Sequence, residues 1–64
     1  MKRSSEELKE QKKLFIETAD IIDEMLKVEE REENGEDIDE KEVEALVGRY
    51  LFKIIELATA LSNA

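Results

Sequence analysis

The stretch from Val43 to Leu61 carries more apolar side chains, spread over a wider arc of a helix, than one neighbouring helix can cover. One row of residues in it follows the alternating spacing of four and three that is typical of helix–helix contacts. The members of this row are Val43, Val47, Tyr50, Ile54, Leu57 and Leu61. A second row beside it consists of Gly48, Leu51, Ile55, Ala58 and Ser62. Two such rows are typical of a helix that touches two neighbours in a bundle.

The stretch from Leu8 to Val28 has a similar surplus of apolar residues. Its first row consists of Leu8, Phe15, Ala19, Ile22 and Leu26. Its second row consists of Leu14, Thr18, Ile21, Met25 and Val28. Because two helices cover only one row on each other, a lone hairpin would leave the remaining apolar rows in water.

Start and stop signals indicate where the first helix begins and ends. Ser4 or Ser5 can cap its start, and Glu7 stands three residues after Ser4, as in a capping box. Asn34 and Gly35 then form a stop signal. Glycine suits this position because it adopts a left-handed conformation without a steric penalty.

The start of the second helix has its own signals. Asp39 as N-cap and Glu42 at the third helical position predict a capping box. Ile38 and Val43 occupy the two positions of a hydrophobic staple, which packs the residue before the cap against the first turn.

These signals predict an all-α fold with one domain, residues 1–64, built as an antiparallel hairpin of two helices near residues 5–33 and 40–63. The loop of about five residues is short enough to make the helices antiparallel neighbours. At a rise of 1.5 Å per residue, the helices would be roughly 43 and 36 Å long. Since one hairpin leaves apolar rows uncovered, we expect a coiled-coil-like four-helix bundle, completed by a second copy or by a heterologous helical partner.

The composition limits how so short a chain can be stabilised. In a domain of 64 residues a single core supplies little stability unless a disulfide, a metal or oligomerisation helps. The chain has no Cys and no His, which excludes disulfides and removes the usual ligands of zinc, copper and haem. Oligomerisation is therefore the remaining way to stabilise the domain. We expect no cofactor and no metal. Ser and Thr residues also lack a candidate base, so we expect no enzymatic activity.

The charges are distributed unevenly along the chain, whose net charge is −8. The segment Glu29 to Glu44 has ten acidic residues against Arg31 and Lys41, a net charge of −8. The segment Met1 to Lys13 has five basic and three acidic residues, a net charge of +2. In an antiparallel hairpin these segments lie at opposite ends, so the charges favour an antiparallel dimer with its two loops far apart.

The acidic residues suggest two other kinds of site. Around Gly35 the acids come close to the pattern of a calcium-binding loop, but Lys41 falls where a bidentate carboxylate is required, so we expect no specific calcium site. The sequence Glu6-Glu7-x-x-Glu10 followed by Glu17-x-x-Asp20 resembles MazG-like nucleotide hydrolases. In that family the two motifs lie on different helices and converge on magnesium. Here six residues separate the motifs on one helix, which rules out such convergence.

The prediction is therefore a non-enzymatic protein–protein interaction module, such as a small adaptor, a regulator or a chaperone-like protein. Its predicted partner interface consists of Val43, Val47, Gly48, Tyr50, Leu51, Ile54, Ile55, Leu57, Ala58 and Leu61, with Phe15, Ile22 and Leu26. One alternative is an acidic nucleic-acid mimic or antirepressor that binds a DNA-binding protein through Glu17, Asp20 and Glu24.

Two resemblances concern the outline of the hairpin. It resembles the Rop-type regulators of plasmid copy number, which dimerise into four-helix bundles, and small hairpin co-chaperones of type III secretion. The second resemblance implies a co-chaperone of a secretion-apparatus subunit as a further alternative. The net charge of −8 argues against direct nucleic-acid binding. No secretory signal and no apolar run long enough to span a bilayer is visible, so we expect a cytoplasmic protein without membrane contact.

Overall fold

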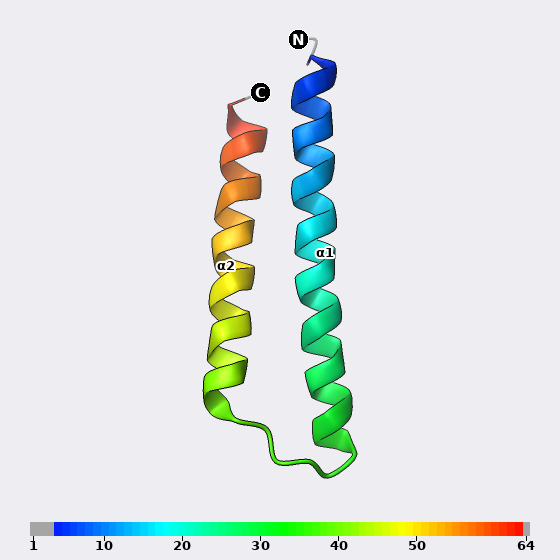
Figure 1. The fold of residues 1–64 in the computed structure, drawn as a ribbon. Helices are drawn as coiled ribbons and strands as arrows, with labels where there is room; N and C mark the ends of the chain where they lie inside the picture. Colours follow the sequence, from blue (N-terminus) through cyan, green and yellow to red (C-terminus); the bar gives the residue numbers. More distant parts are fainter. Residues whose placement is uncertain (1–3, 64) are drawn as a thin grey trace.

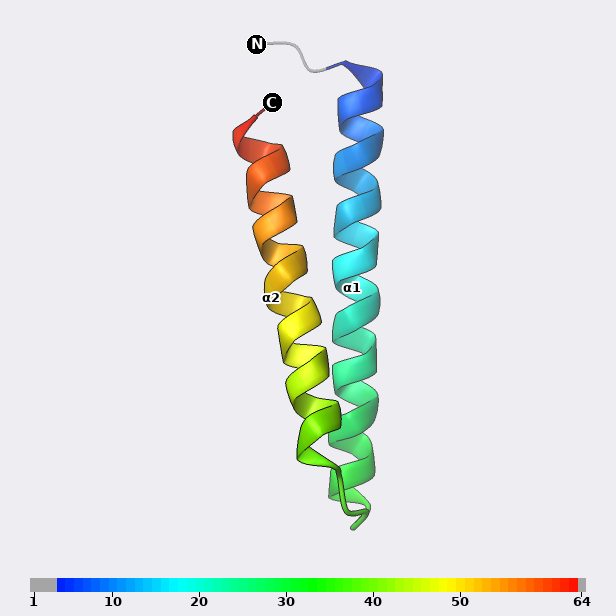
Figure 2. The ribbon, with the colours of Figure 1, turned by 60° about the vertical axis from the view of Figure 1, so that its left-hand side comes forward.

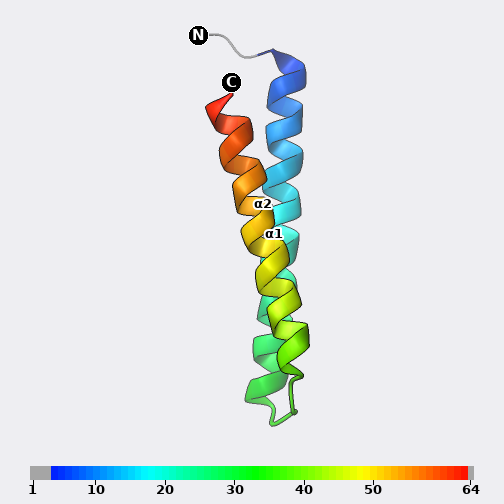
Figure 3. The ribbon, with the colours of Figure 1, turned by 90° about the vertical axis from the view of Figure 1, so that its left-hand side faces the viewer.

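The chain forms two long helices, α1 (Ser5–Glu33) and α2 (Glu40–Ser62), in a computed structural model that describes residues 4–63. The helices run antiparallel and side by side, with the start of α1 and the end of α2 at one end of the hairpin and the loop at the other (Figure 1). Figure 2 shows the helices side by side in a view turned by 60°, and in Figure 3, turned by 90°, α2 lies in front of α1. The hairpin measures 50 × 16 × 13 Å. The predicted all-α helical hairpin is confirmed.

The helix boundaries agree with the start and stop signals to within one residue. The predicted bounds of α1 are confirmed, whereas α2 ends at Ser62, one residue before the predicted end, because Asn63 is its C-cap. Ser4 caps α1: its hydroxyl oxygen accepts a hydrogen bond of 3.1 Å from the backbone N–H of Glu7. Residues 1–3 and 64, which include the basic Lys2 and Arg3 of the predicted charge asymmetry, lie outside the described residues.

The end of α1 is a Schellman motif, in which the chain turns back over the last carbonyls of the helix. The N–H of Gly35 donates to the carbonyl of Glu32 and the N–H of Glu36 donates to that of Arg31. Gly35 has a φ of 87°, in the left-handed region that glycine tolerates best. The predicted stop signal at Asn34 and Gly35 is confirmed.

Replacing Gly35 with alanine should lower the stability of the hairpin. A Cβ at this position meets no atom within 4 Å, so the cost comes from the backbone conformation alone, about 1 kcal/mol. Urea unfolding followed by circular dichroism measures it. Gly48→Ala is the matched control: its Cβ also meets nothing within 4 Å, but this position is helical, so alanine should stabilise by up to about 1 kcal/mol. Equal effects of the two substitutions would contradict this account.

The start of α2 is capped, although not by the predicted box. The Asp39 carboxylate accepts a hydrogen bond of 2.9 Å from the N–H of Lys41. The reciprocal bond predicted for Glu42 is wrong, because the Glu42 carboxylate instead accepts a 2.9 Å hydrogen bond from the Arg31 guanidinium of α1. Ile38 and Val43, the two predicted staple positions, both line an open groove of about 280 Å³ at the start of α2.

The core is a narrow strip between the two helices. Its buried apolar side chains are Leu14 and Ile21 of α1 and Leu46 and Leu57 of α2. Thr18 is also buried, and its hydroxyl donates a 2.7 Å hydrogen bond to the carbonyl of Leu14, which satisfies it inside α1. The second predicted row of α1 therefore forms the hairpin contact, and the first row does not.

The orientation of α2 about its axis differs from either predicted row. Leu46 and Leu57 are eleven residues apart, close to three full turns, so they face α1 from one stripe. Lys53 lies on the same stripe, where its ammonium group reaches the α1 residue Glu17. Leu57 belongs to the first predicted row of α2, and Leu46 belongs to neither row. The side of α2 that meets α1 therefore lies between the first predicted row and the charged side of the helix.

Candidate protein-binding face

The two long sides of the hairpin carry different chemistry. Successive residues of a helix are 100° apart, so the residues just before the buried positions point to one side and those just after them point to the other. Because the helices face each other and run antiparallel, the residues that follow a buried position point to the same side of the hairpin in both helices. The side to which the preceding residues point is charged, and we call it the ion-pair face; its residues are Glu17, Glu24, Arg49, Lys53 and Glu56.

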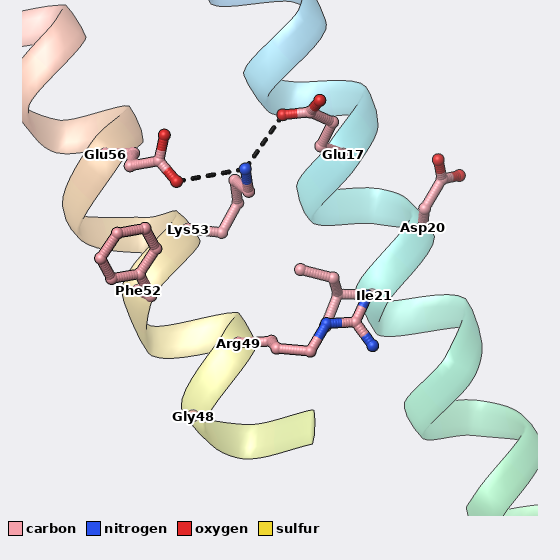
Figure 4. Close-up of a pocket in the computed structure, with 8 residues that line it drawn as sticks. All are labelled: Glu17, Asp20, Ile21, Gly48, Arg49, Phe52, Lys53 and Glu56. Atoms are coloured by element: carbon pink, nitrogen blue, oxygen red, sulfur yellow. Dashed lines mark hydrogen bonds and ion pairs between the residues drawn. The ribbon is translucent and has the colours of Figure 1, made fainter. Parts of the chain in front are cut away.

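Lys53 is the centre of the ion-pair face. Its ammonium nitrogen lies 3.0 Å from Glu17 of α1 and 3.2 Å from Glu56 of α2, and Figure 4 shows it between the two carboxylates. The Lys53 side chain is 19% exposed, so its methylene stem covers core residues while its charge binds both acids. Arg49 adds a second link between the helices with a 3.0 Å ion pair to Glu24.

The hydrogen bond to Glu17, and then the one to Glu56, raises the pKa of Lys53 above its ordinary value of 10.5. A raised pKa means that the charged lysine binds its neighbours more strongly in the folded state. This stabilisation is complete below the pKa of the unfolded chain and is lost as the pH rises through the higher folded value. The ion-pair face therefore keeps this contribution of Lys53 throughout the neutral range and loses it in strong alkali.

A third set of ion pairs closes the loop end. The Arg31 guanidinium binds Glu36 in the loop at 3.0 Å and Glu42 in α2 at 2.9 Å. These bonds, led by the one to Glu42, raise the pKa of Arg31 above its ordinary value. Arg31 thus fastens the last turn of α1 to the first turn of α2 and offsets part of the acidic charge there.

An open groove of about 570 Å³ runs along the ion-pair face (Figure 4). Its lining residues are Glu17, Asp20, Ile21, Gly48, Arg49, Phe52, Lys53 and Glu56. The basic groups in it, Arg49 and Lys53, are bound to carboxylates of the hairpin. The groove therefore contains charged groups that neutralise one another rather than a nucleophile paired with a base.

The opposite side of the hairpin is apolar. Phe15 follows the buried Leu14 in α1, and Val47 follows the buried Leu46 in α2, so both point to this side. We call it the apolar face; its residues are Leu8, Phe15, Ala19, Ile22 and Leu26 of α1 and Val43, Val47, Leu51, Ile54, Ala58 and Leu61 of α2.

The two helices contribute to the apolar face as neighbours. A groove of about 230 Å³ near the loop is lined from both helices, by Met25, Val28, Glu29, Glu32, Val43, Leu46 and Val47. The nine larger side chains of the face are 37% to 55% exposed. On α2, no charged residue interrupts the face between Val43 and Leu61, whereas on α1 Lys12 lies at its edge between Leu8 and Phe15. The result is an apolar strip along most of the hairpin, with Lys12 at its rim.

The predicted interface residues fall into three groups. Nine of the thirteen lie on the apolar face, namely Val43, Val47, Leu51, Ile54, Ala58, Leu61, Phe15, Ile22 and Leu26. Leu57 is buried against α1 and Tyr50 is half-buried at the same contact, so both contribute to the hairpin core. Gly48 lines the groove on the ion-pair face. Ile55 lies on the side of α2 opposite α1 and belongs to neither face.

Sequence reasoning missed three residues of the helix contact. Leu46 and Gln11 are buried, and Lys53 is mostly covered. Leu46 could have been found from its spacing of eleven to Leu57, which is close to three turns. Gln11 could have been found from its spacing of three to Leu14 and seven to Thr18.

The acidic residues of the alternative hypotheses are largely engaged within the hairpin. Of the three acids assigned to a nucleic-acid mimic, Glu17 and Glu24 bind Lys53 and Arg49. Across residues 4–63, no group of three or more acidic side chains is placed to hold a metal ion. In the same part of the chain, neither helix is long and apolar enough to cross a membrane.

Comparison of the chain with protein families, with curated proteins and with solved structures finds no match. The class of the protein therefore follows from its own geometry, a two-helix hairpin with one charged and one apolar face.

Reversing the charge of Lys53 should destabilise the hairpin, because Lys53→Glu would place three carboxylates where one ammonium now binds two. The melting temperature should fall, and adding Glu17→Lys should restore part of it by remaking an opposite-charge pair between the helices. Thermal unfolding of the wild type, both single variants and the double variant measures this coupling. Additive effects of the two changes would show that the pair contributes nothing.

Proposed function

We propose that the chain is a non-enzymatic protein–protein interaction module that binds through its apolar face, either to copies of itself or to a helical partner. The observation that carries the proposal is the combined exposure of nine large apolar side chains on one side of a 64-residue chain. Isolated exposed apolar residues are ordinary on protein surfaces, but a contiguous strip of them is typical of an interaction site.

The small core supports the same proposal. Among residues 4–63, the hairpin buries four apolar residues, Leu14, Ile21, Leu46 and Leu57, and none of the larger side chains is fully covered. A core of this size gives little stability to a single domain, whereas covering the apolar face would add the missing burial. The module would then act as an adaptor, a regulator or a chaperone-like protein in the cytoplasm, and its activity would be binding.

Charge insertion on the apolar face tests the proposal. Val47→Glu with Ile54→Glu places two carboxylates in the strip, so any complex formed through it should dissociate. Thr59→Glu is the matched control, because Thr59 is an exposed residue of α2 outside the apolar face. Sedimentation equilibrium at micromolar concentration detects self-association, and capture from the native host detects another partner.

The expected result is loss of binding for the double variant and retention for Thr59→Glu. A wild-type chain that sediments as a folded monomer would remove self-association and leave only a heterologous partner. Equal behaviour of all three chains in both assays would contradict the apolar face as a binding surface.

A further inference from the structure

We propose that the occupant of the apolar face is a second copy of this chain, packed face to face with its loop at the opposite end. This inference rests on the proposed function of the apolar face and specifies both the partner and its orientation. Area, charge and the positions of two unpaired rim residues support it.

The exposed area suits a dimer. The nine larger side chains of the apolar face together present on the order of 800 Å², which is about what each partner contributes to an interface of standard size. The face is also long, and both helices contribute large apolar side chains to it. A second copy offers a strip of the same length and width, and homodimers most often pair one patch with itself about a two-fold axis.

Charge decides between the two possible orientations. The segment Glu29 to Glu44 gives the loop end a net charge of −8, whereas Met1 to Lys13 carries +2. Packing with both loops at one end would place two strongly acidic segments side by side. Packing with the loops at opposite ends separates these segments by close to the 50 Å length of the hairpin, several times the Debye length of about 8 Å at physiological salt.

The opposite-end arrangement also determines which helices meet. A two-fold axis across the face, perpendicular to the helices, places α1 over α1 of the second copy and α2 over α2. The face runs from Leu8 to Leu26 on α1, so its midpoint lies between Phe15 and Ile22. Phe15 of one copy would then lie opposite Ile22 of the other. The same-end arrangement would instead place α1 over α2.

A charged pair at the rim fits only the opposite-end arrangement. Lys12 and Asp23 both lie on the outer edge of α1 beside the apolar face, on nearly the same helical stripe. Among residues 4–63, neither takes part in an ion pair within the hairpin. Since they lie at similar distances on either side of the midpoint, the two-fold axis brings Lys12 of each copy beside Asp23 of the other. In the same-end arrangement α1 lies over α2 of the other copy, so Lys12 and Asp23 do not meet.

Spin-label distances test the orientation directly. The chain has no cysteine, so Asp37→Cys places a single label in the exposed loop, and Asp20→Cys places one near the middle of the ion-pair face. Neither residue belongs to the apolar face. The expected result is a distance near the 50 Å hairpin length between the two Asp37 labels and a much shorter one between the two Asp20 labels.

The other outcomes are distinct from one another. Short distances at both positions would show a dimer with its loops together, which would overturn the proposed orientation but not the binding role of the face. No dipolar coupling at Asp20 in the concentrated protein would mean that no dimer forms. That result would overturn the second copy as occupant and leave a heterologous partner for the proposed function.

Charge reversal at the rim tests the contact pair. Lys12→Glu should raise the dimer dissociation constant severalfold, and Lys12→Glu with Asp23→Lys should return it toward the wild-type value. Lys13→Glu is the matched control, because Lys13 is the adjacent lysine and points toward the ion-pair face. Equal weakening by the two single lysine variants, or no recovery in the double variant, would contradict this register.

Discussion

Replacing Ile21 with alanine should unfold much of the hairpin, whereas replacing Ile16 with alanine should have little effect. Ile21 is 5% exposed in the centre of the helix contact, and Ile16 is 51% exposed on the outside of the same helix. Truncating a buried isoleucine to alanine costs about 2–5 kcal/mol. Such a loss is comparable to the whole folding stability expected of so small a domain, which is only about 3–10 kcal/mol.

The two variants make the same chemical change five residues apart on one helix, so intrinsic helix propensity affects both alike. Urea unfolding followed by circular dichroism measures the difference in the free energy of unfolding. If Ile16→Ala were as destabilising as Ile21→Ala, the core would not be the strip between α1 and α2.

The melting temperature of the wild-type chain should rise with protein concentration, by about 5 °C for each tenfold increase if folding is coupled to dimerisation. This dependence arises because the apolar face is covered only in the assembled protein. Differential scanning calorimetry over a hundredfold range of concentration measures it.

The double variant Val47→Glu with Ile54→Glu should show no such dependence and should be largely unfolded at room temperature. Thr59→Glu should follow the wild type, since Thr59 lies outside the apolar face. A concentration-independent melt of the wild type, with full helicity in the double variant, would mean that the single hairpin is stable alone.

The helix boundaries could be predicted because their signals are local. The cap at Ser4 and the left-handed turn at Gly35 each depend on residues within one turn of the chain. The turn type and the short loop then leave an antiparallel hairpin as the simplest arrangement. These features required no knowledge of which side of each helix meets the other.

The rotation of α2 could not be predicted in this way. Apolar residues surround so much of this helix that several stripes could face α1, and periodicity does not choose among them. The choice depends on Lys53, which reaches Glu17 thirty-six positions earlier in the chain. A lysine in a helix contact is unexpected from hydropathy alone, and its place follows from the pairing of distant charges.

Nine of the thirteen predicted interface residues come from both helices and lie together on the apolar face. That this face binds a partner stays a prediction. That these residues share a side depends on the rotation of each helix, so the sequence pattern alone left the geometry of the face open. The proposed pairing with a second copy depends on charge and shape at the rim of the face, which no periodicity describes.

The ion-pair face has a consequence for how large an assembly can grow. A hairpin that was apolar on both sides could bind a neighbour on each and extend into a filament. Here the second side is occupied by Lys53, Arg49 and their carboxylate partners. Stacking another apolar strip on it would desolvate these charges without new partners. If the apolar face pairs two hairpins as proposed, we expect growth to stop there, because the charges that fasten each hairpin also disfavour further stacking.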